Sequence, residues 1–348
     1  MSGIARNLKD GNRLMSNELP IGKLARADLA RLVYPYLGTR RADILLHANM
    51  GEDAAALDLG GELCVLSVDP ITGTAQRIGW LAVHIAANDL AACGAEPVGL
   101  LLTILLPPHC PAQDLEQIMA DASRAAASLG MEILGGHTEV TPYLPQAVIV
   151  SAAVGKVGKG HLLSSGGSRP GDTLYITKQA ALEGTAILAA EFRQNRLNRM
   201  PAATLDQAES FLQEISVVPE GLLARTQAVH AMHDLTEGGL IGGAWEMMSA
   251  SCCGLRLDLS RVPLRTETKT ICQALAVDPY RLVSSGAMLI SAPAGQLEAL
   301  FKEKGISLTP IGEFLPEHKF FLHQGNVEQE GEPEVHEELW RILKESPD

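Results

Sequence analysis

The stretch Ala86-Ala-Asn-Asp-Leu-Ala-Ala-Cys-Gly-Ala-Glu-Pro97 places two polar residues inside a run of small apolar ones. The small apolar residues predict a buried helix, and the apolar run Val98–Leu106 that follows predicts a buried strand. Asn88 and Asp89 would then lie where side chains are normally apolar. Because an unpaired carboxylate is costly to bury, Asp89 is expected to have a partner that offsets its charge.

Acids in similar surroundings occur at two earlier places in the chain. The stretch MGEDAAAL (residues 50–57) sets Glu52 and Asp53 between a glycine and a run of alanines. The stretch LSVDPITG (residues 66–73) puts Asp69 directly after the apolar run Leu63–Val68, and Pro70 cannot continue a hydrogen-bonded ladder. Each acid therefore stands beside residues that are usually buried.

A third polar cluster lies in LGGHTEVT (residues 134–141), where two glycines interrupt an apolar run. His137, Thr138 and Glu139 follow Gly135 and Gly136. Glycine and small polar residues are common in an ordinary turn, which is the simpler interpretation. The alternative is a ligand site at the end of a strand.

The acids have one common explanation if they converge in space. Two carboxylates about 4 Å apart repel each other by roughly 4 kcal/mol at an effective dielectric near 20. Few Lys or Arg residues stand near these acids in the sequence. Oxygen ligands without paired histidines or cysteines are typical of Mg²⁺, which usually binds a few carboxylates together with substrate phosphates. Taken singly, each acid is better explained as a cap or turn residue, but four such sites within the first 140 residues favour metal and phosphate.

The second half contains one comparable stretch, HDLTEGGLIGGAWEM (residues 233–247). Asp234 and Thr236 precede Gly238 and Gly239, and a helical pattern follows. Free backbone N–H groups at such a helix N-terminus suit a phosphate, although an ordinary capping loop has the same composition. The chain has neither a Walker P-loop nor a G-x-G-x-x-G motif.

The order of the apolar runs predicts an α/β fold in two domains. A segment rich in Gly, Ser and Pro (residues 155–171) marks the boundary. We expect a flexible N-terminal segment at residues 1–21, domains at 22–158 and 168–320, and a tail with a short helix at 321–348. The clearest helix is Gln113–Leu129, with Gly130 as its cap.

Composition limits the class of protein. The formal net charge of −13 over 348 residues argues against nucleic acid as a partner. No segment has the roughly 18 uninterrupted apolar residues of a membrane span. The six cysteines form no C-x-x-C pair, and the first residues lack the apolar core of a secretory signal. A cytoplasmic protein with reduced cysteines is expected.

Six motifs together resemble the aminoimidazole ribonucleotide (AIR) synthase superfamily, and most closely its HypE-like "AIR synthase-related" members. The resemblance rests on residues 51–55, 67–69, 88–97, 135–138, 184–188 and 233–239. It implies an N-terminal sheet that forms a barrel in a homodimer and a C-terminal α/β domain that closes over it. ATP would lie in the groove, and Mg²⁺ would be held by acids that match Asp53, Asp69 and Asp89, with Glu52 beside them.

The chain departs from the family pattern in several ways. His137 stands where relatives carry an acid next to the phosphates, so Glu139 is an alternative source of the missing carboxylate. Lys23 lies in a segment that folds over the nucleotide in relatives, although a solvated lysine is the simpler interpretation. The chain lacks the cysteine tail of HypE, and no cysteine precedes Cys64, as selenophosphate synthetases would require.

Two hypotheses of function follow. The first is a Mg²⁺-dependent ATP-binding enzyme, a transferase that phosphorylates or activates a small acceptor, with thiamine-monophosphate kinase as a named variant. Asp53 and Asp234 would be its catalytic residues, while Asn88, Thr138 and Thr236 would orient phosphate or substrate. The second is a non-catalytic nucleotide-binding accessory protein that binds a partner in metalloenzyme maturation.

Overall fold

The computed structural model describes residue 24 and residues 26–49, 51–72, 77–325, 327–331 and 337–344. The chain divides into two compact units, residues 1–38 and residues 39–348. In the first unit the structure describes helix α1 (Arg26–Leu32) and the 3₁₀ turn η1 (Tyr34–Tyr36). Lys23 and the predicted segment 1–21 lie outside the described residues. Both sheets belong to the second unit.

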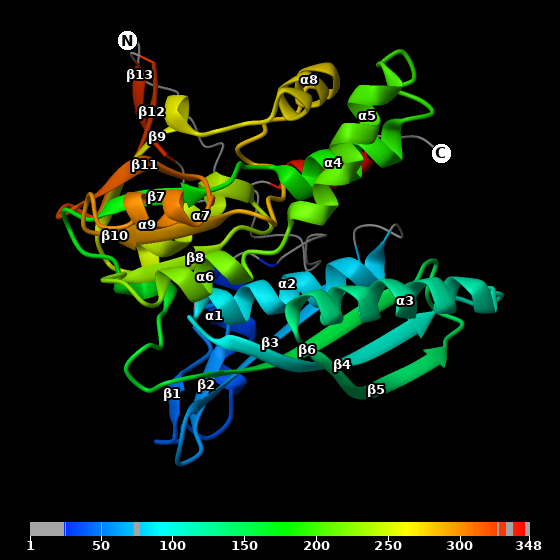
Figure 1. Ribbon diagram of the computed structural model, residues 1–348, viewed down its shortest axis with the longest axis horizontal. Helices are drawn as coiled ribbons and strands as arrows, with labels where there is room; N and C mark the ends of the chain where they lie inside the picture. The colour runs from blue at the N-terminus through cyan, green and yellow to red at the C-terminus, as the bar shows by residue number, and fades with distance from the viewer. Residues whose placement is uncertain are drawn as a thin grey trace, which may run out of the picture. The chain divides into compact units, whose positions relative to one another are not determined.

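Sheet A is built from the first half of the second unit (Figure 1). All of its strand pairs are antiparallel except β4 with β5, which are parallel because helix α3 (Ala112–Leu129) connects them. Helices α2 (Ile78–Ala92) and α3 pack together on one face of the sheet. The strands, in spatial order, are β1 (Ile44–Leu46), β2 (Ala55–Asp58), β3 (Leu63–Ile71), β6 (Val148–Val157), β4 (Glu96–Leu106) and β5 (Glu132–Val140).

Helix α2 is apolar on nearly every side, and almost all of its residues are buried. A helix of this kind must be covered all round. Sheet A covers one side, while α6 (Val218–Ala224) and β8 (Ala231–Asp234) of the second half contact another. The indole Nε1 of Trp80 donates to the carbonyl of Leu212 at 2.7 Å, which adds a polar link. One hydrophobic core therefore extends through both halves.

Sheet B is formed by the second half, and its pairs are antiparallel except β9 with β12. Its strands, in spatial order, are β13 (Val327–Glu330), β12 (Phe320–Gln324), β9 (Gly254–Asp258), β11 (Leu308–Leu315), β7 (Thr173–Thr177), β10 (Met288–Ala292) and β8. The other helices of this half are α4 (Leu182–Phe192), α5 (Ala202–Glu209), α7 (Gly239–Ala250), α8 (Thr266–Leu275), α9 (Glu298–Glu303) and α10 (Glu338–Lys344). Three 3₁₀ turns complete it, η2 (Ser165–Gly167), η3 (Ser210–Glu214) and η4 (Leu259–Arg261).

The predicted α/β class is confirmed, and the apolar runs at residues 63–68 and 98–106 both lie in strands. Helix α3 ends at Gly130, whose φ of 68° is the left-handed cap conformation. Within the part of the chain that the structure describes, no helix has the length and apolar character needed to cross a membrane.

Three local expectations are corrected. Asp69 and Pro70 lie inside β3 rather than after it, because β2 pairs only with residues 63–66 and leaves one side of Pro70 without a strand. The stretch from Gly135 to Val140 continues β5 instead of ending it. Strands β12 and β13 pair within sheet B, so the predicted tail at residues 321–348 contains strands as well as a short helix.

Candidate functional site

Four carboxylates from distant parts of the sequence converge where α2 meets both sheets. Asp53 precedes β2, Asp69 lies in β3, Asp89 in α2, and Asp234 ends β8. Asp69 and Asp234 both act electrostatically on Asp89, and Asp53 acts on Asp234. The hydroxyl of Ser67 donates to Asp89. The fold thus brings together acids that lie up to 181 positions apart in the sequence (234 minus 53).

Burial and mutual repulsion keep part of this cluster protonated. Burial raises the pKa of Asp89 well above its usual range, and the charges of Asp69 and Asp234 raise it further. Burial, followed by the charge of Asp53, raises the pKa of Asp234 to about 8. Buried carboxyl groups that repel one another have raised pKa values when no cation balances their charge. A cation would lower both pKa values.

Several oxygen atoms of the cluster have no hydrogen-bond partner. These buried atoms are Glu52 Oε2, Asp69 Oδ2 and Asp234 Oδ2. Burial also raises the pKa of Glu52 to about 7, with Asp53 adding to the effect. Since carboxylate oxygens are the ligands that Mg²⁺ prefers, this donor set fits a magnesium ion.

The same acids do not form a complete metal cage. Among the described residues, no group of three or more His, Cys, Asp or Glu side chains is arranged to hold a metal ion. Mg²⁺ usually takes one or two carboxylates and fills its remaining positions with water and substrate phosphates. The arrangement therefore suits a metal that binds together with a nucleotide, with Glu52, Asp53, Asp69 and Asp89 as the available ligands.

His233 is a member of the site that sequence analysis missed. Its Nδ1 lies 2.9 Å from Asp53 Oδ1, and its Nε2 lies 3.2 Å from Glu246 Oε2. The hydroxyl of Ser165 lies 3.1 Å from Nδ1. Burial lowers the pKa of His233, but Asp53 and Glu246 outweigh burial, so the pKa is well above its usual value. A protonated imidazole thus neutralises Asp53. The only signal in the sequence was its place next to Asp234.

Asn88 has a structural use in this chain. Its side-chain N–H donates to the carbonyl of Ile215, and its side-chain oxygen accepts from the N–H of Val217, both at 2.8 Å. The side chain is fully buried. Since both ends of the amide are engaged, Asn88 joins α2 to the segment before α6.

The glycine-rich stretch of β5 lies apart from the acids within one chain. Asp69 pairs with Ser151, Ser151 with Leu102, and Leu102 with Gly136. Three strand spacings separate Asp69 from Gly136, which is about 14 Å. The structure therefore does not bring Gly135, Gly136, His137, Thr138 or Glu139 to the acid cluster.

The polar side chains of β5 instead pair with each other. His137 Nε2 lies 3.1 Å from Glu139 Oε2, and the two side chains are 65% and 50% exposed. Gly136 is needed for packing, because a Cβ atom at this position would lie 1.8 Å from the carbonyl oxygen of Leu102. Gly136 thus reflects close strand contact in the folded chain, whereas a Cβ atom at Gly135 would meet only the Leu101 side chain, at 3.8 Å.

The glycine-rich loop before α7 binds a side-chain carboxylate of the same chain. The N–H of Gly238 donates to Glu337 Oε2 at 2.5 Å. Glu337 Oε1 accepts from the N–H groups of Val283 at 3.1 Å and Leu339 at 2.8 Å. The carboxylate just before α10 therefore occupies the place that the sequence suggested for a phosphate beside Thr236 and Gly239.

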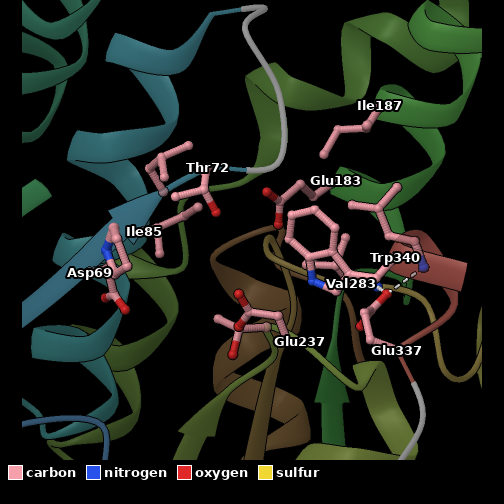
Figure 2. A pocket seen from close by; sticks show the side chains of 13 residues that line it. Asp69, Thr72, Ile85, Glu183, Ile187, Glu237, Val283, Glu337 and Trp340 are labelled. Carbon is pink, nitrogen blue, oxygen red and sulfur yellow. Dashed lines mark hydrogen bonds between the residues drawn. The ribbon is translucent and has the colours of Figure 1, made fainter. Parts of the chain in front are cut away.

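A pocket lies between the end of β3, the start of α4 and this C-terminal segment (Figure 2). Asp69 lines one side of it. Glu183, Glu237 and Glu337 line the other, around the indole of Trp340. The pocket thus connects the acid cluster to a second group of carboxylates.

Two family models match the chain. The AIR synthase related protein N-terminal domain matches residues 51–157, and the corresponding C-terminal domain matches residues 169–324. The chain belongs to the AIR synthase-related family. The two matches cover most of both sheets. The first contains three of the four converging acids, Asp53, Asp69 and Asp89, and the second contains Asp234.

Relatives within the family include named enzymes. Carbamoyl dehydratase HypE from Rhodobacter capsulatus is 27% identical over 281 residues, which cover 79% of this chain and 80% of that protein. Selenide, water dikinase from Myxococcus xanthus is 28% identical over 262 residues, or 72% of this chain and 70% of that protein.

A solved structure shares the fold. The crystal structure of the hydrogenase maturation protein HypE in complex with ATP matches with a TM-score of 0.66 at 24% identity, covering 83% of this chain and 90% of that chain. At this level of identity the match shows the fold alone.

Proposed function

We propose that this chain is a Mg²⁺-dependent, ATP-binding enzyme that phosphorylates, or activates by phosphorylation, an oxygen of a small-molecule acceptor. The observation that carries the proposal is the set of buried carboxylate oxygens without partners at Glu52, Asp69 and Asp234. Family membership and the ATP complex of a protein with this fold support the choice of nucleotide.

Each acid has a role in this proposal. Asp69 and Asp89, together with Asp53 and Glu52, would hold the metal. When bound, magnesium would neutralise phosphate charge and orient the nucleotide, so no protein nucleophile is required. His233 fixes the carboxylate of Asp53 through its 2.9 Å ion pair.

Asp234 is the proposed catalytic base. It ends β8 beside the acids that would hold the metal, and one of its buried oxygens has no hydrogen-bond partner. Asp53 would act beside it by holding the metal.

The test is calorimetric titration of the purified protein with ATP, with and without Mg²⁺, followed by an assay of the same sample for ADP. Asp69→Asn should abolish the magnesium-dependent part of ATP binding, because it removes a charged ligand whose Oδ2 has no other partner. Asp58→Asn is the matched control, since Asp58 lies on β2 and pairs with Lys159. Normal ATP binding by Asp69→Asn would refute the site.

The assay also separates the alternatives. Release of ADP that rises with thiamine monophosphate would select the thiamine-monophosphate kinase variant. Tight binding without ADP, for any acceptor, would favour the non-catalytic accessory protein, and a protein partner would then be sought by pull-down. The homodimer that the resemblance implies is tested separately by the mass of the protein in solution.

A further inference from the structure

We infer that the pocket between Glu183 and Trp340 binds the alkylamine or alkylguanidine group of a small organic cation, and that this cation, which must also carry an oxygen to receive the phosphoryl group, is the acceptor. The role of the cation as acceptor rests on the proposed function, whereas the binding of a cation depends on the pocket alone.

The charge of the pocket is the first observation. Glu183, Glu237 and Glu337 line it, and Asp69 lies on the opposite side. None of its described lining residues is Lys or Arg. The carboxylate of Glu337 is fixed by three backbone N–H groups, so it cannot turn away toward solvent. A ligand in this space is therefore surrounded by uncompensated negative charge.

Glu183 gives the second and decisive observation. It lies in the first turn of α4, and only 5% of the residue is exposed. Its Oε2 atom is buried and has no hydrogen-bond partner. Figure 2 shows the carboxylate pointing into the pocket. Burial of an unpaired carboxylate is costly, and an N–H donor of a bound cation would offset that cost.

Trp340 adds a recognition element that suits an organic cation. Its indole lies among the three glutamates in Figure 2. An ammonium or guanidinium group is attracted to the face of an indole ring. The side chains of Ile85 and Ile187 also line the pocket and would contact an alkyl stem. The combination of indole, carboxylates and apolar side chains fits an alkylated cation.

The pKa values of the two most buried glutamates agree with a bound cation. Burial, with a smaller contribution from the charge of Glu237, raises the pKa of both Glu183 and Glu337 to about 7. In Glu183, polar groups of Ser285 offset part of the effect, and in Glu337 the backbone N–H groups do so. A bound cation would lower both pKa values and release protons.

The position of the pocket explains why the cation would be the acceptor. Asp69 belongs to both the pocket and the acid cluster proposed to bind metal and nucleotide. A molecule held by Glu183 and Trp340 would therefore have its other end near the phosphates.

The experiment is a titration of the full chain, without ATP, with butylguanidinium and with butylurea, which has the same shape but no charge. We expect butylguanidinium to bind with release of protons and butylurea not to bind. Glu183→Gln should weaken butylguanidinium binding by about tenfold or more. Glu191→Gln, on the exposed face of the same helix, should leave it unchanged.

Three outcomes would overturn the inference: no binding of butylguanidinium, equal binding of butylurea, or unchanged affinity in Glu183→Gln. Titration of the same sample with ATP and Mg²⁺ keeps the two proposals apart. Nucleotide binding without cation binding refutes the pocket and leaves the function intact. Cation binding without nucleotide binding refutes the function and leaves the pocket intact.

Discussion

Replacement of Glu183 by Gln is expected to stabilise the protein, and to do so only at neutral and alkaline pH. The carboxylate is buried, and one of its oxygens has no partner. Gln has nearly the same volume and carries no charge. The variant therefore removes the cost of a buried charge without creating a cavity.

The magnitude follows from the pKa of the carboxyl group. Burial raises it from the ordinary value of 4.5 to about 7. A folded state with a raised acid pKa holds its proton more tightly than the unfolded chain, so the cost is absent at low pH and grows as the pH rises from 4.5 to about 7. Above that range the cost is constant at about 3 kcal/mol, since each pH unit corresponds to about 1.4 kcal/mol.

Urea denaturation at two pH values measures this difference. The gain in unfolding free energy of Glu183→Gln over wild type should be below about 1 kcal/mol near pH 5 and about 3 kcal/mol near pH 8. Glu191→Gln, on the exposed face of α4, should change stability by less than about 0.5 kcal/mol at both. A loss of stability near pH 8, or an equal effect at both pH values, would refute the assignment of a buried and unpaired charge.

Three further predictions concern the core, the sheet and the acids. Asn88→Ala should lower the unfolding free energy by about 2–4 kcal/mol, because it leaves two buried backbone groups unpaired, whereas the exposed Asn198→Ala should have little effect in the same urea titration. Gly136→Ala should lower the unfolding free energy by more than about 2 kcal/mol, because its Cβ would lie 1.8 Å from a backbone oxygen. Gly158→Ala is the control and should not lower it, because the space around Gly158 is open. Asp69→Asn should remove the stabilisation that Mg²⁺-ATP gives in a thermal melt, and an unchanged shift would exclude Asp69 as a ligand.

Local patterns were sufficient for most of the fold. The helix at residues 113–129 shows one apolar face and a glycine cap, and both features depend only on neighbours in the sequence. The four acids were recognisable because each stands beside residues that are usually buried. Their burial requires a shared partner, which made convergence a reasonable hypothesis before the fold was known.

The remaining features depend on contacts between distant residues. Nothing near His233 in the sequence indicates that Asp53, 180 positions away, is its partner. The carboxylate of Glu337 lies 99 positions from Gly238, so its place at the glycine-rich loop depends on how α10 packs. In the sequence, the paired glycines of β5 resemble a turn. Glycine is favoured both where strands lie in close contact and where the chain changes direction.

The burial of α2 on both sides has a consequence for cooperativity and access. Neither half can fold by itself without exposing a helix whose residues are almost all buried in the intact protein. The halves are therefore expected to unfold in a single transition, and separated fragments to aggregate. Wide opening of the molecule along this helix would expose the same surface and is therefore disfavoured. A ligand must instead enter past the rim of the pocket, where the segment that begins at Glu337 forms one wall, held in place by the backbone N–H groups that bind its carboxylate.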